Sequence, residues 1–86
     1  LGEDNVRGLI TVILREVPGK IGELERACRE GDVEKILVAA HLLKGTALAM
    51  RGNLMANIAG KMESGAKSLS QGEMDMLLSG LKKEWE

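Results

Sequence analysis

A histidine, a lysine and a glycine lie close together in the stretch HLLKGTALAM, residues 41–50. His41 is the only histidine of the chain, and Lys44 and Gly45 follow it three and four residues later. Residues at these spacings are neighbours on the surface of a helix. A neutral imidazole is a nucleophile at physiological pH, and the phosphoramidate that it forms with a phosphoryl group can pass that group onward. The spacing therefore predicts a helix face with phosphoryl chemistry.

Lys44 and Gly45 each have a role beside such a histidine. Lys44 places a compact positive charge one helical turn away, which suits a phosphoryl group. Gly45 leaves open space where a side chain would crowd the ring, although a glycine inside a helix costs about 1 kcal/mol relative to alanine. Taken singly, the three residues also fit a surface histidine, a solvated lysine and a glycine that permits close helix packing. Only their combination indicates a site.

Length and composition limit the molecule that holds these residues. A chain of 86 residues forms one small domain, and folding at this size buries about 60 to 65% of the surface that the unfolded chain exposes. The chain has no Phe or Tyr and one Trp, so we expect an aliphatic core that includes some of the five methionines. A net charge of −1 without a basic stripe argues against nucleic acid as a partner.

The single cysteine and the hydropathy indicate the compartment. Cys28 alone cannot form an internal disulfide, and it suits a reducing environment such as the cytoplasm. No apolar run approaches the roughly 20 residues that cross a bilayer. Because the chain begins at Leu1 without an initiator Met or a signal peptide, we expect residues 1–86 to be one domain excised from a larger signalling protein.

The longest apolar stripe at helical spacing predicts a first helix that begins at an Asp4 cap and ends at Gly31 in a left-handed conformation. Pro18 interrupts the hydrogen bonding of this helix. Since the stripe keeps its phase across Pro18, we expect a kink there and not an end. The stripe consists of Val6, Leu9, Ile10, Ile13, Val17, Ile21, Leu24 and Cys28.

Three further helices follow by the same reasoning. Asp32 is expected to cap a second helix over roughly residues 33–51, Gly52 to stop it, and Asn53 to cap the third. Ser70 and Glu73 have the spacing of a capping box for the fourth. The expected buried faces are Ile36, Ala40, Leu43, Ala47 and Met50, then Met55, Ile58, Met62, Ala66 and Leu69, and finally Met74, Leu77 or Leu78, Leu81 and Trp85.

Short connections between amphipathic helices favour antiparallel neighbours. The predicted fold is therefore all-α: an antiparallel up-down-up-down four-helix bundle whose first helix is kinked near Pro18. Bundles of this kind support many functions, so the function has to be argued from the site.

The segment from His41 to Ala47 resembles the H-x-L-K-G-[ST]-[AS] motif of histidine-containing phosphotransfer (HPt) domains. The resemblance covers roughly residues 6–69, whereas the last helix matches only in length. Where the family usually has a glycine ten residues after its histidine, this chain has Arg51 and then Gly52. The matching positions outside the motif are Leu24, Ala27, Gly31, Asp32 and Ala40 before it, and Met55, Ile58, Ala59, Met62 and Glu63 after it.

This resemblance implies a phosphorelay intermediate. His41 would accept a phosphoryl group from the phospho-aspartate of one receiver domain and pass it to the aspartate of another. Lys44 would stabilise the charge and Gly45 would give steric access, while the receiver would supply Mg²⁺ and the acidic pocket. The chain has no Gly-rich nucleotide loop, so we expect no autonomous kinase activity, although the domain fits within a hybrid sensor histidine kinase.

An apolar collar around His41 is the expected docking surface for the receiver. Leu37, Val38 and Leu48 project within about 60° of His41 on a helical wheel, and exposed apolar patches often mark interaction sites. The alternative is that the second helix buries a wider arc, which would place these residues in the core. The full set of candidate contacts is Leu37, Val38, Leu48 and Arg51, with Leu14 or Ile21 from the first helix.

Two other classes of function remain open at this point. In the first, the bundle is a structural or docking module for receivers or other proteins, and His41 is incidental. In the second, His41 and Cys28 form a metal or redox site, although two ligands fall short of the three or four that zinc needs. Glu63 and the methionines are interpreted as surface and core residues without chemistry. The near-neutral mixed surface favours a monomer.

Overall fold

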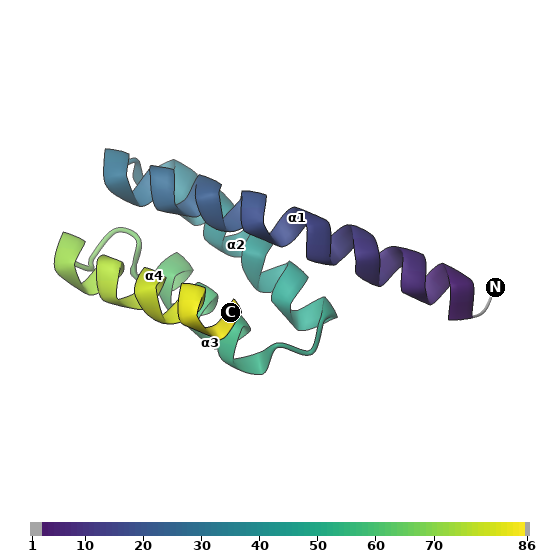
Figure 1. Ribbon diagram of the computed structural model, residues 1–86. Helices are drawn as coiled ribbons and strands as arrows, with labels where there is room; N and C mark the ends of the chain where they lie inside the picture. Colours follow the sequence, from purple (N-terminus) through teal and green to yellow (C-terminus); the bar gives the residue numbers. More distant parts are fainter. Residues whose placement is uncertain (1–2, 86) are drawn as a thin grey trace.

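The protein is an all-α bundle of four helices. The computed structural model describes the backbone of residues 3–85 and, beyond the backbone, residues 8, 11 and 15–85. Its helices are α1 (Glu3–Glu30), α2 (Val33–Ala49), α3 (Asn53–Gly65) and α4 (Gln71–Trp85). Helices adjacent in sequence pack side by side, and α1 also contacts α4, which closes the bundle (Figure 1). The predicted fold class is confirmed.

The first helix is much longer than the others. At 28 residues it spans about 42 Å, so its N-terminal half extends past the ends of the other helices (Figure 1). Pro18 lies inside α1, and the helix continues through it as the unbroken stripe predicted. The kink at Pro18 stays a prediction. The predicted cap at Asp4 is wrong, because Glu3 is already helical.

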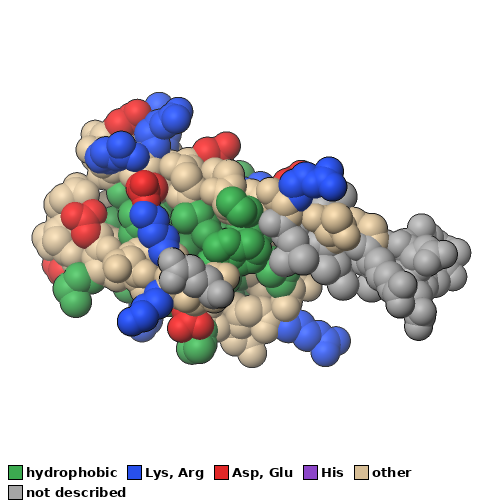
Figure 2. All heavy atoms as spheres, in the orientation of Figure 1, with side chains coloured by type: hydrophobic (Ala, Val, Ile, Leu, Met, Phe, Trp, Pro, Cys, Tyr) green, Lys and Arg blue, Asp and Glu red, His purple; other side chains and the backbone are tan. Residues whose placement is uncertain are grey.

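The core is aliphatic and takes side chains from all four helices. Val17, Leu24, Leu43, Met62 and Leu81 are fully buried, and no described residue with a polar or charged side chain is buried. In Figure 2 the apolar side chains gather along the seam between α1 and α4. The predicted face of α2 is confirmed at Ile36, Ala40, Leu43 and Ala47, to which the structure adds Ala39.

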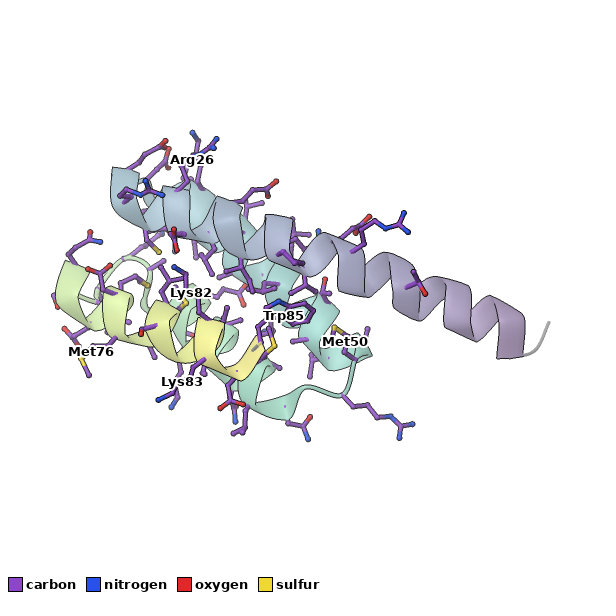
Figure 3. All side chains as sticks on the ribbon, viewed as in Figure 1. Arg26, Met50, Met76, Lys82, Lys83 and Trp85 are labelled. Carbon is purple, nitrogen blue, oxygen red and sulfur yellow. The ribbon has the colours of Figure 1, made fainter. Side chains whose placement is uncertain are left out.

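The seam between α1 and α4 combines apolar packing with an ion pair. Trp85 ends α4, and it packs half-buried against the core (Figure 3). Lys82 of α4 forms an ion pair with Glu25 of α1. The predicted burial of Met74, Leu78 and Leu81 on α4 is confirmed.

The third helix buries a different arc from the predicted one. Met55, Met62 and Ala66 are buried as expected, but Ile58 and Leu69 are only half-buried. The helix ends at Gly65, and the small side chains of Ala56 and Ala59 take the central positions. Small residues let neighbouring helices approach closely, so the apolar stripe alone did not locate the centre of the packed face.

Local side chains begin the helices largely as predicted. The Lys35 backbone N–H donates to Asp32 Oδ1 at 3.2 Å, which caps α2. The Ser70 N–H donates to Glu73 Oε1 at 3.2 Å and the Glu73 N–H donates to Ser70 Oγ at 3.1 Å. These two bonds complete the predicted capping box of α4.

The turn between α2 and α3 differs from the predicted one in the burial of Met50 and in the cap of α3. The second helix ends at Ala49, close to the expected end near residue 51, Met50 is only half-buried, and Arg51 adopts the left-handed conformation with φ 58°. The Gly52 N–H donates to Ala47 O at 2.8 Å and the Arg51 N–H to Leu48 O at 3.0 Å. This pattern places Arg51 at the position where helices that end in this way usually have glycine. Gly52 therefore occupies the cap position of α3, without a side-chain bond, and Asn53 does not.

The end of α1 shows the same hydrogen-bond pattern with the usual residue. Gly31 has φ 68°, the Gly31 N–H donates to Cys28 O, and the Asp32 N–H donates to Ala27 O, both at 3.2 Å. Gly31 was predicted in this role. The two turns thus differ mainly in the residue that adopts the left-handed conformation.

Replacing Arg51 with glycine is expected to stabilise the domain. A side chain in the left-handed region costs energy that glycine avoids, although glycine loses more entropy on folding, so the net gain is about 0.5 to 1 kcal/mol. Thermal unfolding followed by circular dichroism should show a midpoint about 2 to 8 °C higher. Arg51→Ala is the matched control, because it removes the same charge and keeps the strain. An equal gain in both variants would contradict this explanation.

Candidate functional site

His41 lies on the outer face of α2. Its side chain is 67% exposed, although the adjacent Ala40 and the nearby Leu43 are fully buried. The structure therefore places the imidazole at the edge of the packed face of α2, as the helical wheel predicted. A reacting partner can reach the ring from solvent.

A carboxylate on the neighbouring helix holds the imidazole. Glu63 of α3 has its Oε2 2.8 Å from His41 Nδ1, and the Glu63 side chain is 25% exposed. An ionised carboxylate only accepts hydrogen bonds, so Nδ1 carries the proton and donates it. In the neutral ring Nε2 then has the free lone pair. The contact thus leaves Nε2 as the ring nitrogen with an available lone pair.

The same carboxylate binds the lysine of the motif. Lys44 Nζ donates to Glu63 Oε1 at 3.2 Å. Hydrogen bonds from His41 and then from Lys44 lower the pKa of Glu63 below its ordinary value, so it is an anion at neutral pH. Glu63 therefore joins the two side chains, each through one oxygen.

Gly60 and Gly45 lie near His41, Lys44 and Glu63, and they differ in the space around them. A Cβ at Gly60 of α3 would lie 3.4 Å from Lys44 Cδ, so the stem of the lysine rests against this position. A Cβ at Gly45 would meet no heavy atom within 4 Å. Close helix packing therefore does not explain Gly45, and the space beside the ring is open.

The predicted docking residues differ in exposure. Val38 and Leu48 are 60% and 54% exposed, Arg51 is exposed, and Leu37 is half-buried against the core. The prediction that Ile21 contacts a receiver is wrong, because Ile21 is buried in the bundle. Leu14 lies outside the residues whose side chains the structure describes.

Grooves flank the histidine on both sides of α2. A groove of about 1150 Å³ includes Lys44 and Leu48 of α2, Gly60 of α3 and Met76 of α4 in its lining. Another, of about 390 Å³, lies between α1 and α2 and includes Val38 and Leu42. Of the apolar collar predicted around His41, Leu48 thus lines one groove and Val38 the other, whereas Leu37 lines neither.

Cys28 lies away from the site, whereas Glu63 is part of it. Cys28 is buried in the core, and burial raises the pKa of its thiol. Within the described residues no group of three His, Cys, Asp or Glu side chains could hold a metal ion. Glu63, which was interpreted as a surface residue without chemistry, contacts both His41 and Lys44.

The family model for the Hpt domain matches residues 8–86. Comparisons with curated proteins and with solved structures found no match. Because the family model covers most of the sequence, the chain belongs to the Hpt domain family. It is a histidine phosphotransfer module of a phosphorelay, and Hpt domains interact with receiver domains. None of the described helices has the length and apolarity to cross a bilayer.

Proposed function

We propose that His41 carries the phosphoryl group in the relay. The observation that supports this most directly is the bond from Nδ1 to Glu63, because it leaves Nε2 of an exposed imidazole as a free nucleophile. His41 is also the only histidine of the sequence. Histidine phosphotransfer by this chain therefore needs this residue.

The reaction is an exchange of one phosphorus bond for another. The Nε2 lone pair attacks the phosphorus of a receiver phospho-aspartate, the bond from phosphorus to the carboxyl oxygen breaks, and the electron pair leaves with the aspartate. Transfer to a second receiver follows the same path in reverse. Mg²⁺ belongs to the receiver in this proposal.

Lys44 and Gly45 support the transfer in different ways. The ammonium of Lys44 is held by Glu63 close to the imidazole, where it can offset the charge of the phosphoryl group. Gly45 admits the receiver's active site to the ring, which explains a helix-weakening residue in open space. Glu63 orients the ring and fixes its tautomer.

The receiver docks on the collar of Leu37, Val38, Leu48 and Arg51. The exposure of Val38 and Leu48 beside two grooves supports this surface. We propose that the domain is monomeric when isolated and that it works in the cytoplasm as part of a hybrid kinase or another signalling protein. Its partners in this proposal are receivers and not nucleic acid. The single buried Cys28 and the mixed surface charge agree with this.

Leu48→Ser is expected to slow phosphoryl transfer about tenfold and to change the free energy of unfolding by less than about 0.5 kcal/mol. The reason is that Leu48 is 54% exposed and has little packing to lose. Stopped-flow transfer and urea unfolding measure the two quantities. Leu54→Ser is the matched control, since Leu54 is 61% exposed on α3 and lines neither of the two grooves. A large loss of stability in Leu48→Ser would instead place Leu48 in the core.

The function is tested with radiolabelled phospho-receivers. Each of several receivers is incubated with the wild-type domain, and the label on the domain is examined for stability in acid and in alkali. We expect about one phosphoryl group per chain, labile in acid and stable in alkali, as a phosphoramidate requires. If a folded domain binds receivers but no donor labels it, the bundle is a docking module without chemistry.

A further inference from the structure

The hydrogen bond between His41 and Glu63 has a second consequence once the ring is phosphorylated. Attack by Nε2 uses its lone pair, so the ring of the product carries a positive charge while Nδ1 still holds its proton. A positively charged phosphoimidazole releases that proton far more readily than a neutral imidazole does. Without a partner for Nδ1, the proton passes to water and the ring becomes neutral.

Resting on the proposed function, we propose that Glu63 retains the Nδ1 proton on phosphorylated His41, which keeps the phosphoryl group transferable. In onward transfer the bond between Nε2 and phosphorus breaks and its electron pair returns to Nε2. If Nδ1 has kept its proton, the leaving group is neutral imidazole. If Nδ1 has lost it, the leaving group is an imidazolate anion, which is a much stronger base and leaves far more slowly.

The geometry suits this role. The distance of 2.8 Å between Nδ1 and Glu63 Oε2 is that of a charge-assisted hydrogen bond. The other oxygen, Oε1, is bound by Lys44, which restricts rotation of the carboxylate away from the ring. The lowered pKa of Glu63 agrees with a carboxylate that stays ionised beside a charged ring. Glu63 is thus a positioning residue for a proton as well as for the imidazole.

Charged groups on the helices packed against α2 bear on the proton of the ring. The helices that contact α2 are α1 and α3. On α1, Glu30 pairs with Lys35, and Glu25 pairs with Arg29 and Lys82. Glu23 and Arg26 of α1 line the groove beside Val38 and Leu42. Among the described residues, the charged group bonded to His41 is Glu63 of α3, and Lys44 is bonded to the same carboxylate.

The test compares the wild type with Glu63→Gln after chemical phosphorylation. Phosphoramidate donates a phosphoryl group to an imidazole and releases ammonia, so His41 is loaded without any receiver. Glutamine accepts the same hydrogen bond but does not balance the positive ring. We expect ¹⁵N NMR of the phosphorylated ring to show Nδ1 protonated to a pH at least about one unit higher in the wild type than in Glu63→Gln.

A pH profile of onward transfer gives the kinetic counterpart. Onward transfer is measured between about pH 6 and about pH 9. In each protein the rate should fall by up to about tenfold per pH unit once Nδ1 loses its proton, and this fall should begin at a higher pH in the wild type than in Glu63→Gln. Glu34→Gln is the matched control, because it removes an exposed carboxylate from α2 about two turns before His41. It should follow the wild-type profile.

The outcomes separate this inference from the function. If the wild type and Glu63→Gln lose the Nδ1 proton at the same pH, the inference is overturned even where transfer proceeds. If the pH profile of Glu34→Gln shifts as far as that of Glu63→Gln, the net charge and not the hydrogen bond is responsible, and the inference is also overturned. Failure of every receiver to exchange phosphoryl groups with the domain would reject the proposed function. The NMR titration of the chemically phosphorylated domain would still show whether Glu63 retains the Nδ1 proton.

Discussion

His41→Gln is expected to reduce phosphoryl acceptance to background, a loss of more than about a thousandfold. The amide of glutamine has no nucleophilic lone pair, and the chain contains no second histidine to replace the first. Transfer from a labelled phospho-receiver, followed by electrophoresis under alkaline conditions, measures the effect directly. The variant should leave no acid-labile label on the domain.

The loss in His41→Gln should occur without unfolding. The His41 side chain is 67% exposed, and surface substitutions usually change stability by less than about 0.5 kcal/mol. The variant should therefore retain the circular dichroism and the unfolding midpoint of the wild type. Label that persists on a folded His41→Gln domain would assign the phosphoryl group to another residue and refute the central proposal.

Leu43→Ala is expected to have the largest effect on stability. Leu43 is fully buried, and truncation of a buried leucine costs about 2 to 5 kcal/mol, because apolar contacts are lost and a cavity remains. A domain of this size has little stability in reserve. We expect the thermal midpoint to fall by at least about 10 °C. Urea unfolding, followed by the fluorescence of Trp85 and by circular dichroism, gives the change in free energy.

The preceding residue supplies the control for Leu43→Ala. Leu42 has the same side chain and the same helical environment, but it is 47% exposed. Leu42→Ala should cost less than about 1 kcal/mol. Equal losses in the two variants would mean that burial on α2 does not determine stability. Small losses in both would mean that the core accommodates the cavity.

Helix positions were predictable because the signals for them are local. Asp32 and the pair Ser70 and Glu73 cap helices through bonds to residues three positions away. The position of the α2–α3 turn depends instead on which carbonyl accepts from Gly52. That carbonyl is Ala47 O, and the choice forces Arg51 into the left-handed region although the next residue is a glycine. The sequence signal at Gly52 therefore marked the turn but not the residue that adopts the left-handed conformation.

The site was predictable only on its own helix. The spacing of His41, Lys44 and Gly45 places them on one face because a helix fixes neighbours three and four residues apart. Glu63 lies 22 residues from His41 in sequence, so its contact depends on how α3 lies against α2. The one available signal was the resemblance of Glu63 to the end of a family pattern, and that pattern carried no distance. The prediction that Ile21 contacts a receiver was wrong for a related reason, since packing against the other helices decides whether Ile21 is buried.

The paired carboxylate and imidazole belong to consecutive helices that a turn of three residues joins, Met50 to Gly52. Residues 33–65 therefore form a helical hairpin that contains His41, Lys44 and Glu63. The helices α1 and α4 lie outside this hairpin, but each lines one of the two grooves beside it. A substitution on a solvent face of α1 or α4 away from these grooves should therefore alter how many molecules are folded and leave the reactivity of each folded molecule unchanged.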